Sequence, residues 1–92
     1  MERNTKILLV DDEPEFTADM QGKLLAKGWQ VFAVGNRLQA QEVARREKPD
    51  LVILGTIMPR GDAFHLHQWL KQRPDFRQVP LIVVDAPPEK RL

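Results

Sequence analysis

Four short runs made only of apolar residues constrain this chain more than any other feature. They are Ile7–Val10, Val31–Val34, Leu51–Leu54 and Leu81–Val84, and most of their residues are β-branched. A strand with one face in water alternates apolar and polar residues, whereas a continuous apolar run is typical of a strand covered on both faces. The sequence therefore predicts four buried strands of a parallel sheet.

Three stretches with helical start and stop signals separate these runs. Pro14 suits the first position of the first helix, where a missing N–H is no loss. Asn36 followed by Gln39 has the spacing of a capping box for the second helix. We expect Asp62 to be the N-cap of the third helix, which ends before Pro74. The alternation of strand and helix predicts an α/β domain with helices on both faces of the sheet.

Composition excludes several classes of protein. Lys and Arg number 14 and Asp and Glu 13, so a net charge of +1 provides no electrostatic footprint for nucleic acid or for an anionic membrane. The absence of cysteine excludes disulfides, thiolate metal sites and cysteine nucleophiles. No apolar run approaches the roughly 18–20 residues of a membrane span, and the N-terminus lacks the apolar stretch of a signal peptide. We expect one cytoplasmic domain over residues 1–92.

At three places the sequence resembles the receiver domain of bacterial two-component response regulators. The segments are KILLVDDEP from Lys6, PDLVILGTIMPRGD from Pro49 and VPLIVV from Val79, in the order and spacing of the family. The resemblance implies a three-layer, flavodoxin-like α/β fold with strand order 2-1-3-4. A whole receiver has five strands and five helices, so this chain is expected to lack the fifth strand and the last two helices.

The resemblance carries the chemistry of the family over only in part. The acidic pair Asp11 and Asp12 matches residues that hold Mg²⁺, and the backbone of Ile57 matches a further ligand. The position of the phosphoacceptor aspartate, four residues before Pro59, is Gly55. Asp85 replaces the Ser or Thr that contacts the phosphoryl group, and the lysine after the fifth strand has no counterpart. We therefore expect a pseudo-receiver that is not phosphorylated at the usual site, is not an enzyme and requires no cofactor.

A second interpretation keeps a role for the remaining carboxylates. Gly55 would leave empty space between the first and fourth strands, and Asp11, Asp12 and Asp85 could converge over it. Clustered carboxylates either bind a cation or raise the pKa of one another, so weak Mg²⁺ binding and a metal- or phosphate-responsive switch stay open. The simpler alternative is that the acidic pair is a remnant, with one aspartate capping the first helix. A receiver fragment without a function of its own is the third hypothesis.

Interaction with another protein is the expected mode of action. Without a fifth strand the fourth becomes an open edge, and without a fifth helix part of the first and third strands would be uncovered. Trp69 lies off the expected apolar stripe of the third helix, where it either anchors a partner or covers its own helix. We predict a homodimer through the fourth-strand edge or the uncovered face, with a histidine kinase or another receiver as alternative partners. The interaction candidates are Trp69, Leu81, Ile82, Val83 and Val84.

Overall fold

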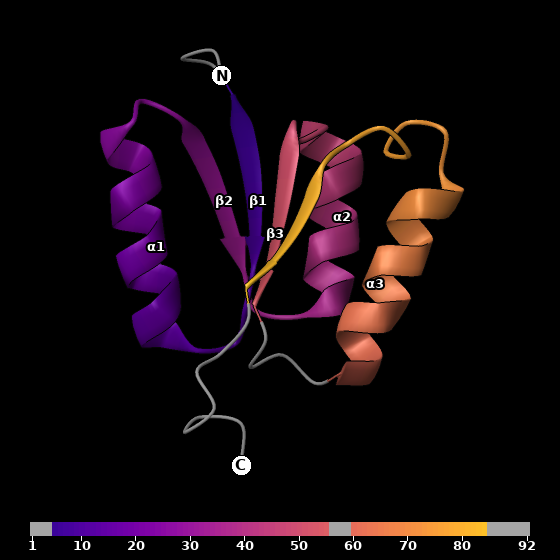
Figure 1. Cartoon of the computed structure of the whole chain (residues 1–92), viewed down its shortest axis with the longest axis horizontal. Coiled ribbons are helices and arrows are strands. Elements are labelled where there is room, and N and C mark those ends of the chain that lie inside the picture. Colours follow the sequence, from indigo (N-terminus) through magenta and orange to yellow (C-terminus); the bar gives the residue numbers. More distant parts are fainter. Residues whose placement is uncertain (1–4, 56–59, 85–92) are drawn as a thin grey trace.

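A four-stranded parallel sheet between helices forms the protein (Figure 1). The computed structural model describes residues 5–55 and 60–84, and only the backbone of residues 60–63. The elements follow in the order β1 (Lys6–Val10), α1 (Pro14–Ala26), β2 (Gln30–Val34), α2 (Arg37–Glu47), β3 (Leu51–Gly55), α3 (Arg60–Gln72) and β4 (Leu81–Val84). The strand order β2-β1-β3-β4 and the three layers are those predicted from the sequence.

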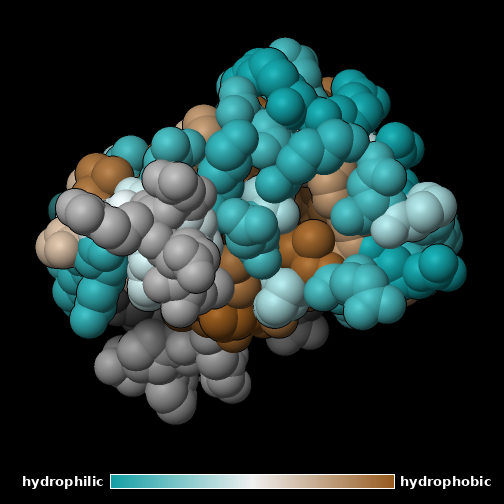
Figure 2. Space-filling view, turned by 90° about the horizontal axis from the view of Figure 1, so that it is seen from above, coloured by the Kyte–Doolittle hydropathy of each residue, from teal (hydrophilic) through white to brown (hydrophobic). Residues whose placement is uncertain are grey.

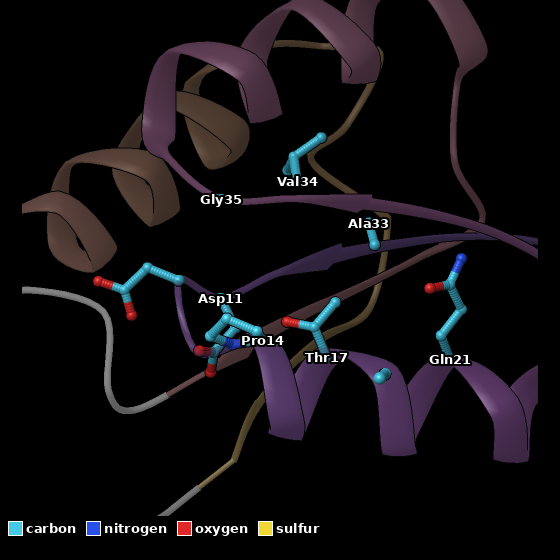
Figure 3. Close-up of a pocket in the computed structure, with 9 residues that line it drawn as sticks. Asp11, Pro14, Thr17, Gln21, Ala33, Val34 and Gly35 are labelled. Carbon is cyan, nitrogen blue, oxygen red and sulfur yellow. The ribbon is translucent and has the colours of Figure 1, made fainter.

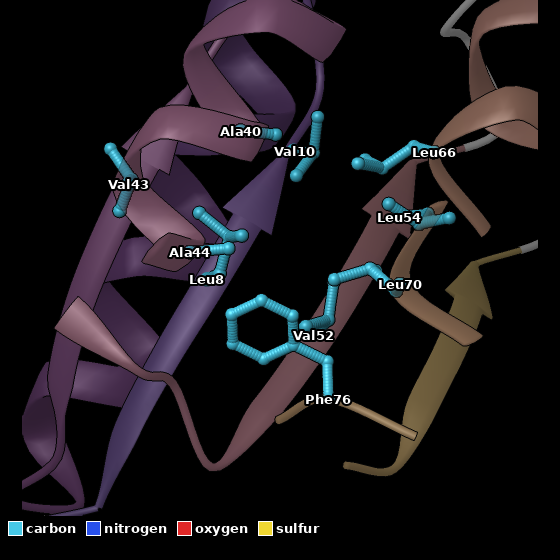
Figure 4. Close-up of a cluster of buried hydrophobic side chains, with 10 residues drawn as sticks. All are labelled: Leu8, Val10, Ala40, Val43, Ala44, Val52, Leu54, Leu66, Leu70 and Phe76. Atoms are coloured by element: carbon cyan, nitrogen blue, oxygen red, sulfur yellow. The ribbon is translucent and has the colours of Figure 1, made fainter. Parts of the chain in front are cut away.

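The two central strands, β1 and β3, are buried on both faces. On one face Leu8, Val10, Val52 and Leu54 pack with side chains of α2 and α3 and with Phe76 (Figure 4). On the other face α1 contributes Phe16, Met20 and Leu24 to a cluster built on Ile7, Leu9, Leu51 and Ile53. No residue from Ile7 to Val10 or from Leu51 to Leu54 is more than 6% exposed. The expectation that part of these strands would be uncovered is therefore wrong, because α1 together with Trp29, Val31 and Val84 closes this face.

Helix termini follow the sequence signals in two cases and depart from them in a third. Pro14 occupies the first turn of α1, and the Asn36 side chain accepts a hydrogen bond from Gln39 N at 2.9 Å. The Gln39 side chain does not return to Asn36 but accepts from Gly35 N at 3.2 Å. Helix α3 begins at Arg60, so Asp62 lies inside the helix and is not its N-cap.

An irregular segment, residues 73–80, connects α3 to β4 and is anchored by Phe76. Phe76 is 1% exposed and its ring lies 5.7 Å from that of Trp69, with an interplanar angle of 29°. Arg73 lies over the Trp69 ring at 4.9 Å, and Lys48 Nζ lies 5.4 Å from the centre of the Phe76 ring. This packing holds the connection against the core and so positions the strand that follows it.

Candidate functional site

The carboxyl ends of β1, β2 and β3 meet at one edge of the sheet, where ligands bind in open α/β folds. Asp11 and Asp12 follow β1, Gly35 follows β2, and Gly55 is the last residue of β3. Asp11 N donates to Val34 O at 3.1 Å, which extends the pairing of β1 and β2 by one residue. The sheet therefore brings the first acidic residue and the acceptor position together, as the sequence predicts.

The Asp11 side chain is built into the protein and does not project into solvent. Asp11 is only 3% exposed, and its Oδ1 accepts a hydrogen bond from Glu13 N at 2.6 Å. Burial raises the pKa of the Asp11 carboxyl above its ordinary value, because the charged form loses hydration. The bond from Glu13 N lowers this pKa in part, whereas the charges of Asp12 and Glu13 raise it.

The space beside Gly55 is filled by Asp11. A Cβ atom placed on Gly55 would overlap with Oδ2 and Cγ of Asp11 and would lie 2.9 Å from its Cβ. The expectation of empty space above Gly55 is therefore wrong. The reason is that Gly55 has no side chain, and the carboxyl group of Asp11 on the neighbouring strand occupies the room beside it.

Glu13, which the sequence analysis did not single out, caps α1. Its Oε1 accepts a hydrogen bond from Glu15 N at 3.0 Å. The expectation that Asp11 or Asp12 caps this helix is therefore wrong. The Asp11 side chain instead accepts a hydrogen bond from the backbone N–H of the cap residue, Glu13. The signal was present in the sequence, since the residue before a proline at the first helical position is the N-cap by position.

A groove of about 500 Å³ lies beside this edge, between α1 and β2 (Figure 3). Its polar lining includes Asp11, Asp12, Thr17 and Gln21. Within the described part of the chain, the Thr17 hydroxyl is buried and has no hydrogen-bond partner. The described residues that line the groove include no Lys or Arg, so they offer a phosphoryl group no counter-charge.

The carboxylate cluster proposed from the sequence is not formed by the residues that the structure describes. Asp12 is exposed while Asp11 is buried. Asp85 and the Ile57 backbone, the other two members of the predicted site, lie outside the described residues. Within the described ranges no three His, Asp or Glu residues are grouped as a metal site would require.

The predicted interaction residues are placed in two different ways. Trp69 is partly buried and stacks on Phe76, which favours the second of the two alternatives, a residue that covers its own part of the protein. In β4, Leu81 and Val84 are partly buried, whereas Ile82 is 49% and Val83 is 56% exposed. Within the described residues β4 pairs only with β3, so it lies at the edge of the sheet, as predicted.

Comparison with known proteins identifies this arrangement of sheet and acidic edge as a signalling domain. A scan against protein families matches residues 7–91 to the response regulator receiver domain. The probable transcriptional regulator ycf27 of Pyropia yezoensis is 36% identical over 81 residues, which cover 88% of this chain and 32% of that protein. The chain belongs to the receiver domain family and spans about a third of the length of this relative.

Solved structures show the same fold. The receiver domain of a signal transduction histidine kinase from Syntrophus aciditrophicus is 32% identical, with a TM-score of 0.78 over 92% of this chain and 66% of that one. The receiver domain of the sensor kinase PA1611 from Pseudomonas aeruginosa, which holds a magnesium ion in its active-site cleft, is 25% identical. Its TM-score is 0.83, over 96% of this chain and 72% of that one.

The Mg²⁺ ion that the family implies does not fit the described residues. Mg²⁺ needs near-octahedral oxygen ligands and is usually bound by one or two carboxylates together with waters and a phosphoryl group. Here residue 55, which the resemblance aligns with the acceptor carboxylate, is a glycine, and Asp11 is buried and hydrogen-bonded to the backbone. Asp12 is the remaining exposed carboxylate of the family set among the described residues.

Proposed function

We propose that this chain is a pseudo-receiver of two-component signalling that acts by binding a second copy of itself. The carrying observation is Gly55, which stands at the end of β3 where the family has its phosphoacceptor. Phosphoryl transfer to a receiver needs a carboxylate nucleophile, and a glycine has none. The proposal includes no enzymatic activity and no required cofactor, and it places the chain in the cytoplasm.

The exposed edge of β4 supports the choice of a second copy as partner. An edge strand normally carries charges, a proline or a bulge that prevents pairing with another chain. Leu81–Val84 contains no charged residue and no proline, and Ile82 and Val83 are about half exposed. Figure 2 shows apolar patches near the middle of this view, beside more hydrophilic surface.

The hydrogen bonds of β4 suggest how two copies would pair. Pro80 O accepts from Val52 N at 3.1 Å, so residues 80, 82 and 84 direct their backbone groups toward β3. Leu81 and Val83 then direct theirs outward. A two-fold axis makes the two edge strands antiparallel. If Leu81 of one copy pairs with Val83 of the other, the outward N–H and C=O groups of both residues all form hydrogen bonds between the copies. The two Ile82 side chains would then lie opposite each other.

The test is the mass of charged edge variants in solution, by light scattering after size exclusion. We expect the unaltered chain to form a concentration-dependent dimer and Ile82→Lys to be monomeric, because two like charges would face each other at the axis. Leu25→Lys is the matched control, since Leu25 is 51% exposed on α1, a helix that packs against β1 and β2. Equal masses for Ile82→Lys and Leu25→Lys would exclude the β4 edge as the dimer interface.

A kinase or another receiver is the alternative partner. Receiver domains interact with kinases and with other regulators of two-component systems. A monomeric unaltered chain that binds a purified histidine kinase, with binding lost in Ile82→Lys, would move the proposal to this partner. No helix in the described part of the chain is long and apolar enough to cross a membrane.

A further inference from the structure

We propose that Asp11 and Gly55 form an interdependent structural pair in which the Asp11 side chain closes the former phosphorylation site to divalent cations. The inference concerns the site at the end of β1 and β3 and does not rest on dimerisation through β4. It assigns Asp11 a structural role in place of the metal-binding role that the family implies.

A side chain at position 55 and the Asp11 carboxyl group would occupy the same space. Even the single methyl group of an alanine at position 55 would overlap the Asp11 carboxyl group. The neighbouring glycine at the end of β2, Gly35, has no such conflict, because a Cβ there would meet only the Asp11 backbone oxygen at 4.0 Å. The present position of Asp11 therefore requires a glycine at 55 and makes no such demand at 35.

A hydrogen bond holds the buried Asp11 carboxyl group in this position. Asp11 Oδ1 is tied to Glu13 N at 2.6 Å, and Glu13 is the N-cap of α1. A cation that used Asp11 as a ligand would have to compete with Glu13 N for Oδ1 or bind Oδ2, which lies against Gly55. Turning the carboxyl group outward to meet the cation would break the bond to Glu13 N and leave a void beside Gly55. An unfilled void and an unsatisfied backbone N–H both cost stability, so the closed arrangement is favoured over an open metal site.

The pair also determines what a reverting substitution would do. Gly55→Asp would place a second carboxyl group in the space that Asp11 occupies. Two carboxylates in one buried site repel each other, and one of them must move or bind a proton. Restoring the acceptor residue alone is therefore not expected to restore a receiver site.

A double-mutant cycle on the intact chain tests the pair. The folding equilibrium constant is measured by urea denaturation for the unaltered chain, Gly55→Ala, Asp11→Ala and the double variant. We expect Gly55→Ala to lower this constant at least about tenfold in the unaltered background and by a much smaller factor beside Asp11→Ala, because the overlapping group has then been removed. Gly35→Ala is the matched control and should have the same effect in both backgrounds.

The outcomes separate clearly. A Gly55→Ala variant that does not fold but is rescued by Asp11→Ala supports the pair. Equal losses in both backgrounds, or no rescue, would overturn it.

Calorimetry with Mg²⁺ gives a second readout: we expect no saturable binding up to millimolar metal in the unaltered chain. Saturable Mg²⁺ binding that Asp11→Ala abolishes would also overturn the inference, whatever the oligomeric state.

Discussion

Replacing Phe76 by alanine tests whether the segment before β4 is anchored as described. The ring is 1% exposed and stacks on Trp69, with Lys48 and Arg73 beside it. Truncating a fully buried Phe costs about 3–5 kcal/mol. A chain of 92 residues has a free energy of unfolding of about 5–14 kcal/mol, at roughly 0.05–0.15 kcal/mol per residue. Phe76→Ala is therefore expected to remove a large share of the stability.

Urea denaturation followed by circular dichroism and tryptophan fluorescence measures this loss. Phe64→Ala is the matched control, because it makes the same substitution at a residue of α3 that is 57% exposed. We expect the control to change the free energy of unfolding by less than about 1 kcal/mol, as is usual at surface positions. If Phe76→Ala costs no more than Phe64→Ala, residues 73–80 are not held against the core and the position of β4 is not fixed by this ring.

Two further predictions concern Asp11 and the cap of α2. Because burial raises the pKa of Asp11 above the ordinary value of 3.8, the folded state holds the proton more tightly than the unfolded state. The contribution of Asp11 to stability therefore decreases as the pH rises from about 4 through the raised pKa. Asp11→Asn removes this dependence, so parallel stability–pH curves for the two proteins would contradict the prediction. Asn36→Ala should cost about 1 kcal/mol, since it removes the acceptor of Gln39 N; an unchanged urea midpoint would show that this cap contributes nothing.

The strands were predictable because their signal is local. Each run from Ile7–Val10 to Leu81–Val84 is apolar without interruption, which is typical of a strand in a parallel sheet. The expectation that all four are buried on both faces holds for β1 and β3 and is wrong for β2 and β4, whose residues are all partly buried or exposed because each strand pairs on one side only within the described residues. The edge position of β4 followed from the strand order that the family resemblance supplied. The closure of the α1 face did not follow, because it depends on how far Phe16, Met20 and Leu24 reach across the sheet.

The site was predictable in its residues but not in its geometry. Sequence spacing places Asp11 and Gly55 at the ends of neighbouring strands. It carries no information on the rotamer by which the Asp11 side chain fills the space beside Gly55. Phe76 was missed because it is a single apolar residue in a polar connection, without periodicity. Trp69 was placed off the apolar stripe of α3 and its role was left open, although its spacing of three residues from Leu66 puts both on one face of a helix.

The most direct test of the account is the mass of the unaltered chain in solution, measured by light scattering over a range of concentrations with and without acetyl phosphate and Mg²⁺. We expect a concentration-dependent dimer whose mass and population do not change when the phosphodonor and metal are added. A monomer at every concentration, or a dimer that forms only with acetyl phosphate and Mg²⁺, would contradict it.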